Sequence, residues 1–166
     1  MIYIKSYKIL FYISLLIMFS VPTIVYSTIG LLSINMLNGI IISTSNTLQS
    51  IYYLMPSGSP GLNKYKMQIE DLDLDFKLQI IKDWLNKETT VSLESTKSNE
   101  FNKIKNGIGE SCIKISNILD EINKEISYHS TKYFSSYRTL DLTEQITKLI
   151  HHNKIMNERI LLINLV

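Results

Sequence analysis

An unbroken apolar run near the start of the chain is its strongest pattern. Residues 9–26 read ILFYISLLIMFSVPTIVY and contain no charged side chain. A helix needs about 20 such residues to cross a bilayer, so the run predicts a membrane span at about 9–27. Lys5 and Lys8 precede it, which predicts a cytoplasmic or matrix-side N-terminus. We expect the span to be retained as an anchor rather than removed as a signal peptide.

The next stretch, 29–55, is apolar but less uniform. It reads IGLLSINMLNGIIISTSNTLQSIYYLM and holds ten Ser, Thr, Asn or Gln residues. A second membrane span is one interpretation, and an interfacial helix is the other. We favour the second interpretation, in which the apolar half, 29–42, lies in or along the membrane against a partner, with Gly30 and Gly39 allowing close approach. Residues 1–55 then form the predicted membrane anchor.

Pro and Gly residues cluster after this stretch. The run MPSGSPGL, from Met55 to Leu62, has two prolines and two glycines, which interrupt regular structure. Because Gly58-Ser59-Pro60-Gly61 lacks the spacing of a nucleophile elbow, we interpret it as a turn. Residues 56–62 are the predicted linker, and 63–166 the predicted helical extramembrane region.

Between residues 72 and 80 the sequence LDLDFKLQI alternates strictly between apolar and polar positions. The alternation fits a half-buried strand, yet an apolar stripe at helical spacing passes through the same residues: Ile69, Leu72, Phe76, Ile80 and Trp84. A helix would also present a second apolar face: Leu74, Leu78, Ile81 and Leu85. Because a lone strand would have no sheet to join, we favour a helix over 71–81 that is buried on both sides, with the strand left open. The polar stretch 88–99 is interpreted as a loop or frayed turn.

Two longer stretches downstream show helical periodicity. In the first, apolar residues recur at spacings of three and four: Phe101, Ile104, Ile108, Cys112, Ile115, Leu119, Ile122, Ile126 and Tyr133, with His129 in the remaining step. One extra step of four, between Ile108 and Cys112, is a stutter in a heptad pattern. The stretch Phe101 to Tyr133 therefore predicts one long amphipathic helix whose seam contacts another helix.

The second periodic stretch runs to Val166. Asp141, with Glu144 three residues later, has the capping-box arrangement that begins a helix. Its periodic positions are Leu142, Ile146, Leu149, Asn153, Met156, Ile160 and Ile163. With a loop at about 135–139, the two helices predict a hairpin or stalk, so the expected fold class is all-α with an N-terminal transmembrane helix. The apolar segment ILLINLV, 160–166, needs a cover, which we expect from partner subunits.

Charge is distributed very unevenly along the chain. Residues 9–63 contain no Asp, Glu, Lys, Arg or His, whereas 64–166 carry 13 Lys, 2 Arg and 15 acidic residues and so have no net formal charge. The overall charge of +2 therefore equals the contribution of Lys5 and Lys8. This distribution excludes a broad basic face for nucleic acid and an acidic solubilising tail.

The amino-acid usage of the chain indicates the base composition of its gene. The chain has no alanine, 27 isoleucines, and 15 lysines against 2 arginines. Isoleucine and lysine have AT-rich codons, whereas alanine has GC-rich ones, so the usage predicts an AT-rich gene, as in an organelle genome or an AT-rich microbe. Alanine is the best helix former, and packing must compensate for its absence.

Motifs that carry chemistry are missing from the sequence. It contains no phosphate-binding loop, dinucleotide fingerprint, HExxH, CxxC or EF-hand pattern. The adjacent His151 and His152 diverge by about 100° on a helix, which disfavours joint metal binding, and we interpret them as a solvated face. The third histidine is His129, and the single cysteine, Cys112, is expected to be a small buried side chain.

An acidic cluster surrounds the alternating run: Glu70, Asp71, Asp73 and Asp75. These residues lack the spacing and turn glycine of a calcium loop, so we interpret them as a charged helix edge. Trp84 is expected to be a packing anchor. We predict no catalytic, cofactor-binding or metal-binding residue, no cofactor and no enzymatic activity.

The apolar span Ile9–Tyr26, followed by YSTIGLLSINMLNGIIISTSNTLQS from Tyr26 to Ser50, resembles the peripheral-stalk subunit b of F-type ATP synthases in its mitochondrially encoded form. The likeness covers about a quarter of the chain. It implies a non-catalytic role, in which the membrane helix binds the proton-conducting subunit and the helices beyond 62 hold the stator against rotor torque. Two features differ from the family pattern: Gly39–Thr47 carries no charge, and Pro and Gly residues interrupt the stalk at 56–61.

Three functional hypotheses follow. A stalk subunit, or an accessory subunit of another respiratory complex, would reside in the mitochondrial inner membrane and bind other subunits through the span 9–27 and the seam Phe101 to Tyr133. A single-pass sensory or adhesive protein would instead display a helical bundle from the plasma membrane of an AT-rich microbe. In each case the lipid bilayer is a partner and nucleic acid is not. A transporter is disfavoured, because 9–63 has no ionisable residue.

Overall fold

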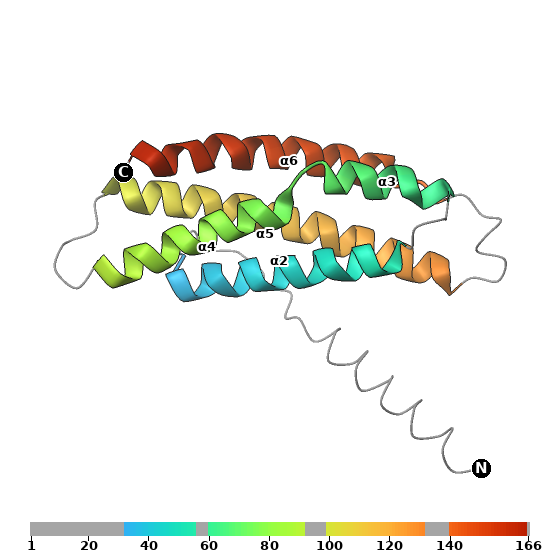
Figure 1. Ribbon diagram of the computed structural model, residues 1–166, viewed down its shortest axis with the longest axis horizontal. Helices are drawn as coiled ribbons and strands as arrows, with labels where there is room; N and C mark the ends of the chain where they lie inside the picture. The colour runs from blue at the N-terminus through green and yellow to red at the C-terminus, as the bar shows by residue number, and fades with distance from the viewer. Residues whose placement is uncertain (1–31, 56–59, 92–98, 132–139, 166) are drawn as a thin grey trace, which may run out of the picture. The chain divides into compact units, whose positions relative to one another are not determined.

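The structure, a computed structural model, describes residues 32–55, 60–91, 99–131 and 140–165. All of them lie in one unit of the chain, Leu31–Val166. The elements are α2 (Ile34–Leu54), α3 (Pro60–Glu70), α4 (Leu74–Val91), α5 (Asn99–Ser130), α6 (Thr143–Leu161) and a final 3₁₀ turn, Leu162–Leu165 (Figure 1). The all-α prediction is confirmed for these ranges, in which no residue lies in a β-strand.

Several predictions from the sequence lie outside the described residues: the span at 9–27, Gly30, most of the linker 56–62, the loop at 135–139 and the seam residue Tyr133. In the part of the chain that the structure describes, no helix combines the length and apolar character needed to cross a membrane. The stretch 29–55 is described from residue 32 onward, and its helix α2 is a member of the bundle.

α2 and α5 lie side by side and run in the same direction (Figure 1). The Thr47 hydroxyl donates a hydrogen bond to Asp120 at 2.9 Å, and the Ser50 hydroxyl donates one to Asn123 at 3.1 Å. Both pairs are separated by 73 residues in the sequence. An equal offset at successive turns means that the two helices are parallel.

α6 packs on α5 in the opposite direction. Near one end of the pair, Gln145 donates to Glu125 at 2.6 Å, and near the other end Arg159 donates to Ser111 at 2.9 Å. The residue number rises along α6 while it falls along α5, so these helices are antiparallel. α5 is therefore covered by α2 and by α6.

α4 runs antiparallel to α2 on its other side. Gln49, late in α2, donates to Asp75 at the start of α4, whereas Ile42, early in α2, lines a pocket together with Lys82 further along α4. The chain thus runs from left to right through α2, back through α3 and α4, again from left to right through α5 and back through α6 (Figure 1).

The core lies among the inward faces of these helices. Its fully buried large side chains are Leu37, Leu48, Ile51, Met55, Ile69, Leu74, Leu78, Ile81, Leu85, Ile108, Ile115 and Leu119. The seam predicted for Phe101 to Ile126 is confirmed, with Ile104 only partly buried. The sequence did not identify Lys105, Gly109, Ser111 and Ile118 as buried positions of the same helix. They are buried because α5 contacts two neighbours and not one.

A break between α3 and α4 corrects the stripe predicted for 69–84. Residues 71–73 form a turn, and Asp73 adopts a left-handed conformation with φ 51°, which Asp tolerates better than most residues. The turn resets the helical phase. On α4 one face is buried, and the other carries Phe76, which is 60% exposed. The helix over 74–81 is confirmed, but its burial on both sides is wrong.

Two predicted helix ends also need correction. α3 begins at Pro60, inside the predicted linker, as suits proline in a first helical turn. α4 continues to Val91, so the first four residues of the predicted loop 88–99 are helical and 92–98 lie outside the described ranges.

The start of α6 differs in detail from the predicted capping box. Asp141 Oδ1 accepts a hydrogen bond from the Thr143 backbone N–H at 3.0 Å, so Asp141 does bind the helix start. Glu144 instead pairs with Lys148 at 2.6 Å, because a partner one turn along the helix competes for its carboxylate. The N-cap residue of α6 is Leu142, which makes no side-chain capping bond, so the capping box predicted for Asp141 and Glu144 does not form.

Glycine allows close packing within the bundle on α5, whereas the approach of a partner expected at Gly39 stays a prediction. Gly39 is exposed, and a Cβ there would meet no atom within 4 Å. At Gly109, by contrast, a Cβ would collide with the Leu32 side chain, and at Gly107 it would meet Arg159 Nε at 3.5 Å. These two glycines let the residues before α2 and near the end of α6 approach the same part of α5.

Candidate functional site

A shallow pocket of about 130 Å³ opens between α2 and α4. Its floor is apolar, formed by Ile41 and Leu78, which are 3% and 1% exposed. Its rim carries hydrogen-bonding and charged side chains: Ser45, Asn46, Asp75, Gln79 and Lys82. A small ligand that is polar at both ends and apolar in the middle would match this lining.

Asp75 is held in place on the pocket rim by α2. The Ser45 hydroxyl donates to Asp75 Oδ1 at 3.2 Å, and the Gln49 amide donates to Asp75 Oδ2 at 3.2 Å. A carboxylate has about four acceptor sites, so two contacts leave it able to accept a donor from a ligand. Asp75 therefore links two helices and can also bind a cation or an ammonium group.

The rest of the acidic cluster lies at the turn between α3 and α4. Glu70, Asp71 and Asp73 are exposed, and Glu70 is 3.9 Å from Lys66. Within the described ranges, no three His, Cys, Asp or Glu residues come close enough to hold a metal ion. Only Asp75 of the predicted cluster reaches the pocket.

The acidic cluster contributes to a shift in the pKa of the neighbouring Tyr52 phenol. Burial raises the pKa of Tyr52 to about 12, and the negative charges of Asp75, Glu70 and Asp73 add to this rise. A raised pKa means that folding favours the neutral phenol. The stabilising effect is fully present below the ordinary value of 10.0 and is lost as the pH rises toward about 12.

Titration of Tyr52 can be followed by ultraviolet absorbance of the phenolate. The difference between wild type and Tyr52→Phe should contain a phenol that ionises near pH 12. Tyr53→Phe, which removes a side chain that is 86% exposed, is the control for the loss of one phenol. Ionisation that is complete near the ordinary pKa of about 10 would contradict the burial of Tyr52.

Lys77 connects α4 with α6. Its ammonium donates to the Leu72 carbonyl, at the turn before α4, and to Asn153 Oδ1 at 3.0 Å. Asn153 is 6% exposed, and Lys77 is its polar partner across the helix interface. Burial lowers the pKa of Lys77, while the nearby Asp73 opposes this shift. We predicted Asn153 as an apolar-stripe position, and the structure assigns it a polar contact.

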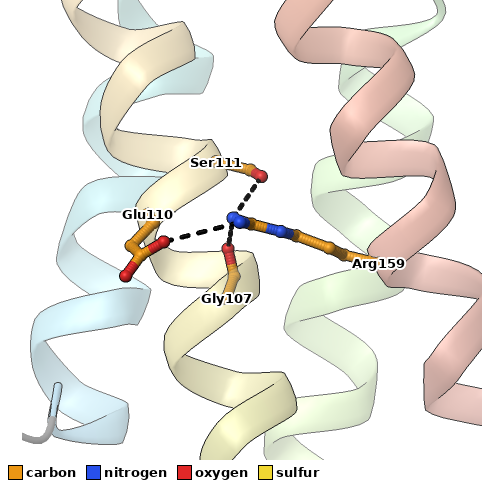
Figure 2. Close-up of polar contacts among 4 residues, drawn as sticks. All are labelled: Gly107, Glu110, Ser111 and Arg159. Carbon is orange, nitrogen blue, oxygen red and sulfur yellow. Dashed lines mark hydrogen bonds and ion pairs between the residues drawn. The ribbon is translucent and has the colours of Figure 1, made fainter.

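Arg159 binds the end of α6 to α5 (Figure 2). Its guanidinium donates to the Gly107 carbonyl, to Ser111 Oγ at 2.9 Å and to Glu110 Oε2 at 3.4 Å. Gly107 has no side chain between the helices, which gives the guanidinium access to the backbone. The sequence offered no signal for this contact, because its partners lie 48 to 52 residues away.

The three histidines do not converge. His151 and His152 touch, with ring centroids 5.1 Å apart and ring planes inclined at 65°, which the expected divergence did not anticipate. Burial lowers the pKa of His152, and the positive charges of Lys114, His151 and Arg159 lower it further. His129 lies near the end of α5. No acidic group joins the histidine pair among the described residues, so the pair offers two ligands at most.

Cys112 and Trp84 have the packing roles predicted for them. Cys112 is fully buried, and burial raises the pKa of its thiol to about 12. Trp84 is 9% exposed and packs against the Phe101 ring at a centroid distance of 5.1 Å. Of the predicted turn Gly58-Ser59-Pro60-Gly61, the first two residues lie outside the described ranges and the last two begin α3.

The reactivity of the single thiol should report unfolding. A rise in pKa from 9.0 to about 12 lowers the thiolate fraction at neutral pH about a thousandfold. We expect Ellman's reagent to label native Cys112 slower by at least that factor than the unfolded chain. A Tyr53→Cys, Cys112→Ala variant presents an exposed thiol as the control. Equal labelling rates for the two native proteins would contradict the burial of Cys112.

The sequence missed most of the polar groups between the helices. Ser45, Thr47 and Ser50 on α2 each bond to an acidic or amide side chain on α4 or α5. They are among the ten polar residues that make 29–55 less uniform, and the sequence assigns them no partner. Identification of the partners requires knowledge of which helices are neighbours.

We compared the chain with known proteins at three levels. Neither a protein-family model, nor a curated protein, nor a solved structure matches it.

Proposed function

We propose that this chain is a membrane-anchored protein whose helical bundle binds a ligand or partner outside the membrane, as in a single-pass sensory or adhesive protein of an AT-rich microbe. The observation that carries this proposal is the way in which α2, α4, α5 and α6 fold back on one another around their own core. A binding module needs such a self-contained body, and a stator does not.

The surroundings of α5 favour a bundle over a stalk. α5 has 32 residues, which corresponds to about 48 Å of helix. A stalk would use the seam of such a helix to bind other subunits along its length. Here α2 and α6 of the same chain cover it, so the partner-binding surface proposed at Phe101 to Tyr133 is already occupied over the described part.

The pocket between α2 and α4 supports a small zwitterionic ligand whose two charges lie at opposite ends of an aliphatic chain, such as an ω-amino acid. Lys82 offers a positive charge for the carboxylate, Asp75 offers a negative charge for the ammonium group, and the apolar floor between the helices suits the aliphatic chain. The plasma membrane is the location that fits a receptor for such a ligand.

Extraction of the native membrane with a mild detergent tests the proposal. After sizing, mass spectrometry would identify whatever migrates with this 19.2 kDa chain. We expect migration alone or as a small homo-oligomer. Co-migration with rotary ATP synthase subunits would overturn the proposal in favour of the stalk, and co-migration with another large assembly would favour an accessory subunit.

Ligand binding can be tested separately on the purified full-length protein in detergent. We expect one or more ω-amino acids, at concentrations well above their Kd, to raise the thermal midpoint followed by Trp84 fluorescence. Lys82→Gln should abolish this rise, whereas Lys114→Gln, an exposed position on α5, should retain it. If none of the amino acids raises the midpoint, the pocket does not bind them.

The stalk subunit is the second candidate. It is favoured by the likeness of Ile9–Tyr26 and the following stretch to subunit b, and it would place the chain in the mitochondrial inner membrane, in contact with the proton-conducting subunit. The geometry favours it less, because the described helices leave no long unpaired rod to carry torque.

A further inference from the structure

The chain reaches and leaves the bundle at one end. Leu32, just before α2, packs against Gly109 of α5, and Arg159, near the end of α6, binds Gly107 and Ser111 of the same helix. The start of α2 and the end of α6 therefore lie at the same end of the bundle, as Figure 1 also shows. We call this the base of the bundle.

Large apolar side chains are exposed at the base. Leu161 and Leu162, which follow the Arg159 contact directly, are 66% and 42% exposed, and Met36 in the first turn of α2 is 46% exposed. Arg159 holds the last turn of α6 against α5 through three hydrogen bonds (Figure 2). The two leucines are thus presented at a fixed place and not on a loose tail.

The proposed anchor keeps the base close to the bilayer. Five residue steps separate Ser27, the end of the predicted span, from Leu32. A fully extended chain covers about 3.3–3.6 Å per residue, so the tether holds Leu32 within about 17 Å of the hydrocarbon region. Apolar side chains at an interface lie about 5–10 Å deep in the boundary between headgroups and acyl chains, which is within this reach.

We infer that the base of the bundle rests on the lipid bilayer, with Leu161 and Leu162 inserted at the surface from which the anchor emerges. This inference rests on the proposed membrane anchor. Burial of a leucine side chain is favourable by about 1.5–3 kcal/mol, and the short tether supplies the high effective concentration that makes so small a contact sufficient. Two features then keep the bundle at the membrane: the short length of chain before α2 and the insertion of the leucine pair after α6.

Fluorescent probes that are quenched by brominated lipid test whether the base of the bundle contacts the bilayer. The full-length protein, with Cys112→Ala, would carry Leu161→Cys, Leu162→Cys or Tyr128→Cys, each labelled with an environment-sensitive fluorophore and reconstituted in vesicles that contain brominated lipid. Tyr128 is the matched control, since it is 65% exposed and lies near the other end of α5. Twenty or so helical residues, about 30 Å, separate it from the base.

The probes at 161 and 162 are expected to lose roughly half of their emission or more, because insertion brings them within about 5–10 Å of the acyl chains. The probe at 128 should not change. Quenching at all three sites would indicate a bundle that lies flat on the membrane, and a blue shift at 161 without quenching would indicate a protein cover such as a second copy. Either result, or no quenching at any site, would overturn the inference.

Flotation of the same vesicles separates the two proposals: a chain that does not float lacks the anchor, whereas one that floats without quenching lacks only the contact.

Discussion

Ile115→Ala should lower the free energy of unfolding by about 2–5 kcal/mol. Ile115 is fully buried on α5, the helix that α2 and α6 both cover. Truncation removes three carbon atoms from the core, and the two neighbouring helices restrict how far the cavity can collapse. The measurement is urea unfolding of the full-length protein in a non-ionic detergent, followed by the fluorescence of Trp84, the only tryptophan.

Ile150→Ala is the matched control for this effect. Its side chain is 44% exposed, and the substitution makes the same change in helix propensity inside a helix. We expect a loss below about 1 kcal/mol, because little apolar area leaves water at that position. Similar losses for the two variants would mean that α5 is not the centre of the core.

The contact between Lys77 and Asn153 should show strong coupling. Asn153→Leu leaves the Lys77 ammonium with one acceptor fewer, and we expect it to lower the free energy of unfolding by about 1–3 kcal/mol. In a Lys77→Met background the same substitution should be nearly neutral or stabilising, because an apolar pair then replaces a polar one. The test is a double-mutant cycle read by urea unfolding.

The pH dependence gives a second signature of this contact. Because the pKa of Lys77 is lowered in the folded protein, the unfolded chain holds that proton more tightly. The free energy of unfolding should therefore rise with pH between the lowered value and 10.5, and Lys77→Met should lack this rise. Equal effects of Asn153→Leu in the two backgrounds, with an unchanged pH profile, would contradict the contact.

Hydrophobic periodicity predicted the helices in which the pattern continues over several turns. The seam from Phe101 to Ile126 persists over several turns, and it identified α5 and its main buried face. The pattern could not show that α5 has two neighbours, because Ser111 and Gly109 are small and polar or neutral. Their burial depends on α6 and on Leu32, which only the folded chain brings near.

Two other features had no signal in the local sequence. The turn at 71–73 contains neither glycine nor proline, so the alternation around it did not indicate a break. α2 presents Leu37, Ile41 and Leu48 on one face, and such a face is equally suited to lipid or to a protein core. The candidate pocket could not be predicted for the same reason, since Asp75 and Lys82 gain a meaning only when α4 packs on α2.

Contacting residues of α2 and its parallel partner α5 are 73 positions apart, which affects the order in which the helices can pack during synthesis. At synthesis rates of roughly 5–20 residues per second, Thr47 waits about 4–15 s for Asp120 to be translated. α4 arrives earlier, because Ser45 and Asp75 are 30 residues apart. The nascent chain can therefore cover part of α2 with α4 first, before α5 has been made.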